Sequence, residues 1–300
     1  MSIEGTINLM GEEQYYLKLI GFFIGIIILG ITCFIDDVRG VRAIIKLFAQ
    51  ILAAVIVVIC GIKIDSIDIP WLATIGLNDA FATILTIGWI VGITNAINLI
   101  DGLDGLSSGI TLISCLSLLI IFVLNGSPLI AVILITALAG GIVGFLPFNF
   151  NPAKTFIGDT GSNFLGFSLA VISILGIAKT YTAVVIVAPL IILALPIFDT
   201  LFAIVRRIIK GKSLKAILAP DRGHLHHRLM DRGYTQKQAV LILYGLSATL
   251  GMFAIILMES GIWKALSFLL MIFAIIAIGY NDIFNKNRNI NENKQENTEK

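Results

Sequence analysis

The sequence predicts an all-α polytopic membrane protein with about nine transmembrane helices. Two observations lead to this fold class. The 300-residue chain is 57% hydrophobic and only 13% charged, whereas about 25% of residues are charged in a typical soluble domain. Its apolar residues also form runs of about 20, the length at which an α-helix crosses the hydrocarbon core. Together these features exclude a soluble globular enzyme, a disordered chain and a nucleic-acid-binding domain.

The predicted spans are nine apolar segments separated by short polar loops. They cover residues 17–35, 44–62, 80–99, 108–124, 128–147, 164–178, 182–205, 239–258 and 262–280. We therefore expect three regions. Residues 1–16 form an extracytoplasmic segment, 17–284 the transmembrane domain, and the Asn-, Lys- and Glu-rich residues 285–300 a disordered cytoplasmic tail.

The distribution of basic residues predicts the orientation. The face reached after each odd-numbered span carries 17 of the 21 Lys and Arg residues, and the opposite face carries the other four. Cytoplasmic loops are enriched in these residues, so the basic face is predicted to be cytoplasmic. All the polar motifs of the sequence lie on that face, where they can converge on one site at the inner membrane surface.

The first motif is the pair Asp36 and Asp37 at the end of the first span. Burying carboxylates beside an apolar helix costs several kcal/mol unless they are paired, solvated or bound to a metal. The pair is therefore a candidate for catalysis. The alternative is a solvated helix end neutralised by Arg39 and Arg42.

The second motif closes the third span and contains two Asn and two Asp residues. Asn95, Asn98, Asp101 and Asp104 offer oxygen ligands for a hard cation or partners for a sugar, and glycines after each Asp let a ligand approach the backbone. An ordinary polar turn is the alternative.

The third motif, Phe156-Ile-Gly-Asp159-Thr-Gly-Ser162, opens the sixth span. Backbone N–H groups at a helix start bind anions, and Asp159 is suited to Mg²⁺, which takes carboxylates together with substrate phosphates. Phe156 is placed to stack on a base. The alternative is a helix-capping turn with a core phenylalanine.

The fourth motif gathers all three histidines of the chain, His224, His226 and His227, with Arg228 beside them. Structural zinc needs four ligands and usually cysteine, whereas arginine and histidine suit a phosphate. A plain basic loop is the alternative. Asp199, inside the seventh span, is a candidate partner for this loop or a structural residue.

Carboxylates for Mg²⁺, an anion-binding turn, an aromatic side chain and a basic loop together favour a nucleotide-diphosphate substrate. Their position at the membrane surface favours a second substrate carried by a lipid. The predicted chemistry is phosphoryl transfer between the two. A transporter would instead place ionisable residues along a path crossing both faces.

These four motifs, in this order, resemble those of the polyprenyl-phosphate N-acetylhexosamine-1-phosphate transferases (glycosyltransferase family 4) from about residue 17 to 280. The quoted residues are Asp36-Asp37-x-x-Gly40, Asn95-x-x-Asn98-x-x-Asp101-Gly-x-Asp104-Gly105, Phe156-x-Gly-Asp159-x-Gly-Ser162 and His224-x-His-His227-Arg228. The histidine loop is similar to that of the WecA/TagO-like branch.

The resemblance implies transfer of N-acetylglucosamine 1-phosphate from UDP-GlcNAc to undecaprenyl phosphate, giving undecaprenyl-diphosphate-GlcNAc and UMP. Such a reaction is the first lipid-linked step of an envelope polymer such as teichoic acid or lipopolysaccharide O-antigen. It further implies Mg²⁺ (or Mn²⁺) as cofactor, a bacterial plasma membrane with a cytoplasmic active site, and a homodimer as the oligomeric state to test.

The resemblance also suggests roles for individual residues. It implies that Asp159 holds the metal and that Asp36 and Asp37 lie beside the lipid phosphate. The remaining candidates are substrate-binding: Asn95, Asn98, Asp101, Asp104, Asn149 and Phe156 toward the nucleotide, and His224, His226, His227 and Arg228 toward the diphosphate and sugar.

One departure from the family concerns length. The family has about eleven spans, so we expect its first two helices to be missing from this chain. Two alternatives therefore stay open: a phospho-N-acetylmuramoyl-pentapeptide transferase-like activity, and an inactive homologue shortened at its N-terminus.

Overall fold

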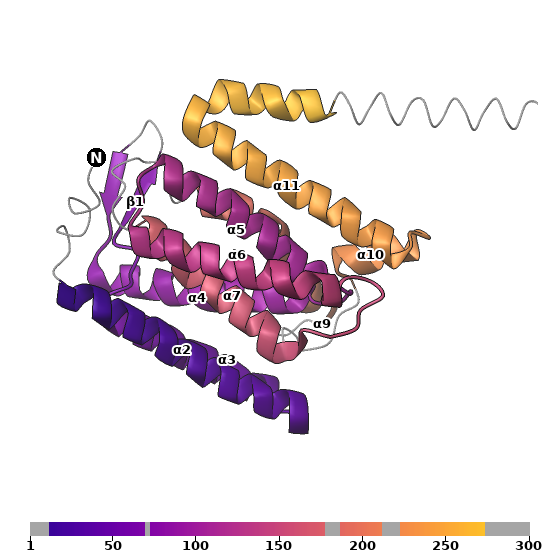
Figure 1. The fold of residues 1–300 in the computed structure, drawn as a ribbon, viewed down its shortest axis with the longest axis horizontal. Coiled ribbons are helices and arrows are strands. Elements are labelled where there is room, and N and C mark those ends of the chain that lie inside the picture. Colours follow the sequence, from indigo (N-terminus) through magenta and orange to yellow (C-terminus); the bar gives the residue numbers. More distant parts are fainter. Residues whose placement is uncertain (1–11, 70–72, 178–186, 212–222, 274–300) are drawn as a thin grey trace, which may run out of the picture. The chain divides into compact units, whose positions relative to one another are not determined.

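A computed structural model describes residues 12–69, 73–177, 187–211 and 223–273 (Figure 1). The predicted tail at 285–300 and most of the predicted extracytoplasmic segment lie outside the described residues. The chain divides into two units after Ile255. The second unit contains the end of the last long helix and the apolar helix Ile262–Phe273, and the rest of the fold belongs to the first.

The described part of the chain is built almost entirely of α-helices, which confirms the all-α membrane class. In order they are α2 Glu12–Arg39, α3 Ala43–Ile59, α4 Asp79–Ile100, α5 Leu106–Leu124, α6 Leu129–Asn149, α7 Gly158–Ile177, α8 Val187–Ile192, α9 Ala194–Gly211, α10 Leu225–Asp231 and α11 Gln236–Ser260.

Strands occur among the described residues only in the connection between α3 and α4. There β1, Ser66–Ile69, and β2, Ala73–Gly76, pair in antiparallel register. The sequence analysis did not predict this hairpin.

Five of the described helices are long and apolar enough to cross a membrane. They lie within α2, α4, α5, α6 and α11, and α3 is a shorter apolar helix. Each coincides with a predicted span to within a few residues. The total of nine spans stays a prediction.

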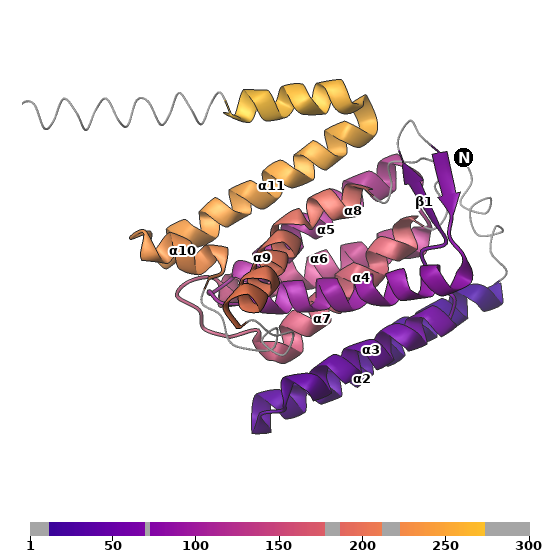
Figure 2. The ribbon, with the colours of Figure 1, turned by 180° about the vertical axis from the view of Figure 1, so that it is seen from behind.

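Helix α7 forms the centre of the first unit and contacts α2, α4, α5 and α6 (Figures 1 and 2). From Ser162 to Gly176 every residue except Phe164 is buried. Its closest neighbour is α4, because a Cβ on Gly166 would lie 2.8 Å from the Thr94 Cα. A glycine at this crossing lets the two backbones touch, as small residues do at helix interfaces in membranes.

The up-and-down order of the helices brings four termini together at one end of the bundle (Figure 1). The end of α2, the start of α3, the end of α4 and the start of α7 meet there. These are the ends that carry the first three motifs of the sequence, so the predicted convergence of these motifs is observed.

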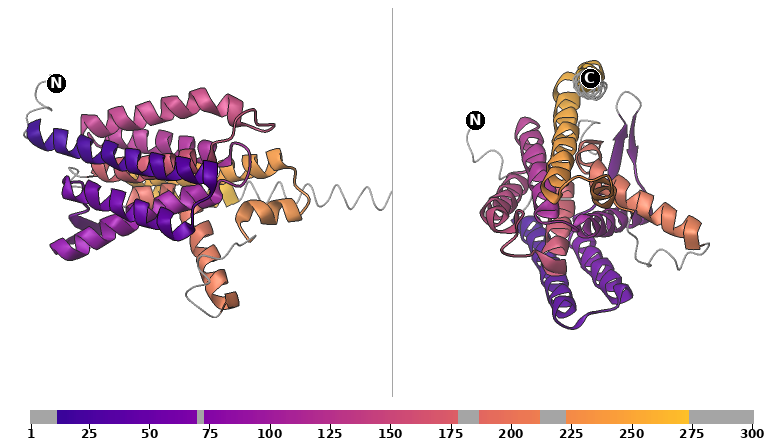
Figure 3. Two further views of the ribbon diagram at one scale, coloured as in Figure 1. Left: turned by 90° about the horizontal axis from the view of Figure 1, so that it is seen from below. Right: turned by 90° about the vertical axis from the view of Figure 1, so that its right-hand side faces the viewer.

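The predicted span at 182–205 is not one continuous helix. Its described part consists of α8 and α9, separated by a turn residue at Leu193. The reason is Pro196, which has no backbone N–H to donate to the carbonyl of Ile192. Helix α9 then leaves the bundle at a steep angle (Figure 3).

Replacing Gly166 with Ala tests the α4–α7 contact. We expect the free energy of unfolding to fall by about 1–3 kcal/mol, because the added methyl group meets backbone that cannot rotate away. Thermal unfolding of the detergent-solubilised protein measures this.

The matched control is Gly92→Ala on α4. A Cβ at Gly92 has no neighbouring atom within 4 Å, so alanine there should be neutral or stabilising through helix propensity. A Gly166→Ala protein that melts no lower than the Gly92→Ala protein would contradict the proposed close contact.

Candidate active site

Asp159, the second residue of α7, has a partner at each polar position of its side chain and backbone. Asn98 donates to its Oδ1 over 3.2 Å, and the Lys46 ammonium donates to its Oδ2. Its N–H donates to Asp37 over 3.0 Å, and its carbonyl accepts from the Asn163 side chain over 2.8 Å. Residues of α3 and α4 therefore hold the carboxylate of Asp159, while residues of α2 and of α7 itself hold its backbone.

Asp37 caps the start of α7 from a different helix. Its carboxylate accepts the N–H groups of Asp159 and Thr160, over 3.0 and 3.1 Å, and the Thr160 hydroxyl over 2.6 Å. A negative charge at a helix N-terminus is favourable because the first N–H groups lack partners in the helix. Gly158, at φ +63°, allows the close approach, since a Cβ there would lie 3.0 Å from an Asp37 oxygen.

Lys46 neutralises the carboxylates of two helices, and the sequence analysis missed it. Its ammonium lies 2.7 Å from Asp36 and also pairs with Asp159. Asp36 accepts the Val41 N–H as well. The expected alternative had Arg39 and Arg42 in this role. A signal was present: Lys46 and Gln50 are one helical turn apart in an otherwise apolar helix.

Asn95 and Asn98 lie on the last two turns of α4 and face α3 and α7. Asn98 also donates to the Ser162 hydroxyl over 2.8 Å, and Asn95 donates to Gln50 over 2.6 Å. Both predicted residues therefore belong to the group of polar side chains around Asp159, called the polar cluster below. Asn98 contacts Asp159 directly, and Asn95 is connected to it through Gln50 and Asn163.

Asp101 caps the end of α4 at the edge of this cluster. The pKa of its carboxyl is raised to about 6, chiefly by burial and to a smaller extent by the charge of Asp159, against the lowering effect of a 2.6 Å hydrogen bond from Ser107. The carboxyl is therefore mostly ionised at pH 7 but changes charge just below that pH.

The histidine loop lies against the turn that follows Asp101. A Cβ on Gly102 would lie 2.3 Å from the His226 Nε2, so only glycine leaves room for this ring. His226 is 2% exposed, and neither ring nitrogen has a hydrogen-bond partner among the described residues. Burial, and then the charges of His227 and His224, lower its pKa to about 4. The ring is thus neutral at pH 7, with one donor and one acceptor that no described residue satisfies.

Asp199 anchors this loop, as one of its two sequence-based interpretations predicted. Its carboxylate lies 2.7 Å from the His224 Nδ1 and accepts the Leu225 N–H over 2.9 Å. His224 and Asp199 are both buried. The interaction fixes the ring of His224 and starts α10. His227 is half-buried at 4.2 Å from the His226 ring, and Arg228 is exposed.

Asp104 and Asn149 hold the loop before α7. Asp104 accepts from the Asn151 side chain over 2.9 Å and from the Ala153 N–H over 3.1 Å. Asn149 is buried and donates to the Thr155 carbonyl over 3.0 Å. The loop presents Phe156 with 76% of its surface exposed. Contact of these three residues with a substrate stays a prediction.

An apolar cavity of about 550 Å³ begins next to the polar cluster. It runs between α2, α6 and α7, and its lining includes Ile157 and Gly161, which flank Asp159 in the chain. Its other walls include Phe22, Phe23, Gly141 and Phe145. One short turn of chain thus borders both a charged cluster and an apolar groove.

The donor chemistry at Asp159 fits Mg²⁺ or Mn²⁺. Its side chain is 34% exposed, and both of its oxygens keep unused lone pairs. Within the described ranges, no group of three or more His, Cys, Asp or Glu residues is placed to hold a metal. Mg²⁺ commonly binds through one or two carboxylates completed by substrate phosphates, so a single well-fixed carboxylate satisfies its requirements.

The glycosyl transferase family 4 model matches residues 19–177, which include the first three motifs. The chain belongs to this family.

Two curated relatives match larger shares of the chain than the family model does. Over 264 residues, 87% of this chain and 72% of the relative, it is 42% identical to the "probable undecaprenyl-phosphate N-acetylglucosaminyl 1-phosphate transferase" of Bacillus subtilis (strain 168). It is 36% identical over 240 residues, 73% of this chain and 59% of the relative, to the decaprenyl-phosphate N-acetylglucosaminephosphotransferase of Mycobacterium leprae (strain TN). The chain thus spans less than two thirds of the mycobacterial relative's length.

The chain also matches a different transferase over a shorter stretch. It is 41% identical to the phospho-N-acetylmuramoyl-pentapeptide-transferase of Chlamydia trachomatis serovar L2 over 88 residues, which are 29% of this chain and 26% of the relative.

The raised pKa of Asp101 predicts how its contribution to stability depends on pH. The folded carboxyl has a pKa of about 6, against an ordinary value of 3.8. Its favourable contribution is therefore present at low pH and is lost as the pH rises through 6. We expect Asp101→Asn to become more stable relative to the wild type between pH 5 and pH 8, by about 1.4 kcal/mol, because the folded pKa lies about one unit above pH 5 and one unit corresponds to 1.36 kcal/mol.

Thermal unfolding at pH 5, 6, 7 and 8 measures this difference. Asp231→Asn, which changes an exposed carboxylate of α10, is the matched control for the charge change. A flat profile for Asp101→Asn would mean that the Asp101 carboxyl is not buried as described.

Proposed function

We propose that this protein transfers N-acetylglucosamine 1-phosphate from UDP-GlcNAc to undecaprenyl phosphate, releasing UMP, at the cytoplasmic surface of a bacterial plasma membrane. The observation that carries the proposal is the turn at Asp159, which borders a polar cluster on one side and an apolar groove on the other. The names of the Bacillus subtilis and Mycobacterium leprae relatives support the same reaction.

The groove supports a lipid-borne acceptor. Its lining is apolar along α2, α6 and α7, so it suits the isoprenoid chain of a polyprenyl phosphate. With the chain in the groove, the phosphate reaches the end where Ile157 and Gly161 flank Asp159.

The remaining motifs support a nucleotide-sugar donor. Phe156 is exposed and offers a face for stacking on a base. Neither ring nitrogen of the neutral His226 has a hydrogen-bond partner among the described residues, and Arg228, two positions later, is exposed. Arginine is suited to gripping a phosphate through two parallel hydrogen bonds.

In this proposal the reaction needs no strong base. A phosphate monoester is largely dianionic at pH 7 because its second pKa is near 6. The larger difficulty is bringing two anions together. Bound Mg²⁺ would supply charge stabilisation at that point. Lys46 lowers the negative charge of the cluster, and Asp37 holds the α7 turn in place through three hydrogen bonds.

A phospho-N-acetylmuramoyl-pentapeptide transfer is the second candidate, because of the Chlamydia trachomatis match. That match covers 29% of this chain, against 87% for the Bacillus subtilis relative. Both reactions break the same type of bond, so the two candidates differ in the donor sugar alone.

The reaction is tested by UMP release from the purified protein in detergent, with UDP-GlcNAc, undecaprenyl phosphate and Mg²⁺. We expect release that depends on the lipid and the metal. Asp159→Asn should lower it by at least about 100-fold, because the side chain loses the charge that would hold the metal.

Two outcomes would contradict the assignments. Lipid-dependent release with UDP-N-acetylmuramoyl-pentapeptide but not with UDP-GlcNAc would favour the second candidate. Full activity in the Asp159→Asn protein would remove Asp159 from the metal site. UDP-GlcNAc binding by the variant, measured by calorimetry, shows whether its nucleotide site remains folded.

Filling the groove tests the acceptor side. Gly141 lines the cavity and has open space around its Cα. Gly141→Phe should raise the KM for undecaprenyl phosphate by about tenfold, which corresponds to about 1.4 kcal/mol of lost binding, and leave the KM for UDP-GlcNAc unchanged.

The matched control is Gly140→Phe, one residue earlier on α6. Gly140 also has open space around it but does not line the cavity. Equal lipid KM values for the two variants would show that the acceptor does not use this groove.

A further inference from the structure

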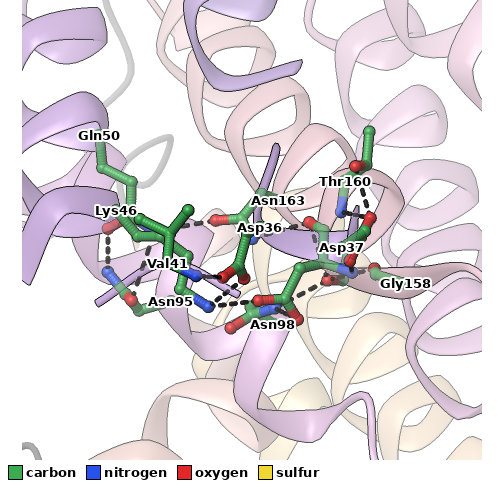
Figure 4. Close-up of polar contacts among 12 residues, drawn as sticks. Asp36, Asp37, Val41, Lys46, Gln50, Asn95, Asn98, Gly158, Thr160 and Asn163 are labelled. Carbon is green, nitrogen blue, oxygen red and sulfur yellow. Dashed lines mark hydrogen bonds and ion pairs between the residues drawn. The ribbon is translucent and has the colours of Figure 1, made fainter. Parts of the chain in front are cut away.

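The amide side chains of Gln50, Asn95 and Asn163 lie together among α3, α4 and α7 (Figure 4). Gln50, from α3, donates to the Asn163 Oδ1 over 2.8 Å and to the Asn95 Oδ1 over 3.4 Å. Asn95, from α4, donates in return to the Gln50 Oε1 over 2.6 Å. Gln50 and Asn163 are 3% and 1% exposed. We call Gln50, Asn95 and Asn163 the amide cluster.

The amide cluster reaches Asp159 through one further bond. The Asn163 Nδ2 donates to the Asp159 carbonyl over 2.8 Å. Gln50 orients this amide, because its own N–H occupies the Asn163 oxygen and so leaves the Asn163 nitrogen facing the carbonyl. A contact between α3 and α7 thereby acts on the backbone of the residue at the centre of the site.

An apolar side chain would serve packing at position 50 at least as well. The other residues of α3 are nearly all apolar, and burying an amide costs free energy unless its hydrogen bonds are made. Gln50 makes them with residues of α4 and α7 rather than within its own helix. This arrangement orders the first turn of α7, which a hydrophobic contact does not do, because hydrophobic contacts have no direction.

Helix α3 then acts on Asp159 twice, from positions one turn apart. Lys46 contacts the carboxylate itself. Gln50, four residues later, contacts the side chain that holds the carbonyl. The two contacts together set both the position and the direction of the carboxylate.

We propose that Gln50 is a positioning residue for the metal-binding carboxylate of Asp159, acting through Asn163. The inference rests on the proposed function, since that function gives Asp159 its metal. Residues that orient a metal ligand typically change metal affinity by about 10–100-fold when they are removed.

The test is Mn²⁺ binding to the purified protein in detergent, measured by electron paramagnetic resonance with saturating UDP-GlcNAc and no lipid acceptor. Gln50→Met keeps the length of the side chain and removes its hydrogen bonds. We expect the Kd for Mn²⁺ to rise by about 10–100-fold. In the UMP assay the Mg²⁺ concentration for half-maximal rate should rise in parallel, and saturating Mg²⁺ should restore the rate, which a damaged fold would not allow.

Asn163→Leu tests the same path from its other end and stands in if Gln50→Met does not fold. It should raise the Kd similarly, and the double variant should show little additional effect, because both changes break one chain of contacts. The control is Thr111→Val on α5, which removes a buried hydroxyl bonded within its own helix and should leave the Kd unchanged.

An unchanged Kd for Mn²⁺ in folded Gln50→Met or Asn163→Leu overturns the inference, as does additivity of the two changes. A wild-type protein that binds no Mn²⁺ overturns it too. The failure of the proposed function is a different result: wild-type protein that binds Mn²⁺ but releases no UMP in a lipid-dependent manner.

Discussion

The ammonium group of Lys46, between the carboxylates of Asp36 and Asp159, is the interaction on which the rest of the site depends. Three carboxylates meet at one end of an apolar bundle, where unpaired charges are costly. Asp37 is balanced by the N-terminus of α7, and the other two share one lysine. Because Lys46 stands on α3, Asp36 on α2 and Asp159 on α7, the same contact also ties three helices into a single register. Removing one partner of such a group leaves an uncompensated charge, which is why the cluster is built as a whole.

The two halves of the site are supported in different ways. Asp159 stands on a helix that is buried along most of its length and touches the backbone of α4, so its position is set by rigid packing. The histidine loop lies outside the bundle and is held by Asp199 and by the hollow at Gly102. A rigid carboxylate and a separately anchored loop suit a reaction that joins a membrane-borne acceptor to a water-soluble donor.

Much of this arrangement could be predicted from the sequence, because the order of the spans alone places alternate loops on the same face. Asp159 and Asn98 were identified from motif chemistry and do lie together. The sequence does not mark Lys46 as a site residue, because a lysine on the predicted cytoplasmic side is already explained by the distribution of basic residues. Gln50 was hidden in an apolar run, and the direction of its amide depends on which residues of α4 and α7 face it. Asp36 and Asp37 could not be told apart, because adjacent helical residues point to different neighbours and those neighbours come from distant parts of the chain. The break between α8 and α9 follows from Pro196, which has no backbone N–H to donate.

The contact between Gly102 and His226 has a consequence for how the family can diverge. Because a Cβ at residue 102 would lie 2.3 Å from the His226 Nε2, a side chain at 102 and the ring in its present position exclude each other. A lineage that gains a side chain at 102 must move or replace the histidine at 226, whose ring nitrogens have no hydrogen-bond partner among the described residues. Co-variation of these two positions across relatives therefore indicates a change in the groups that the histidine loop can offer to a ligand, rather than neutral drift in the loop.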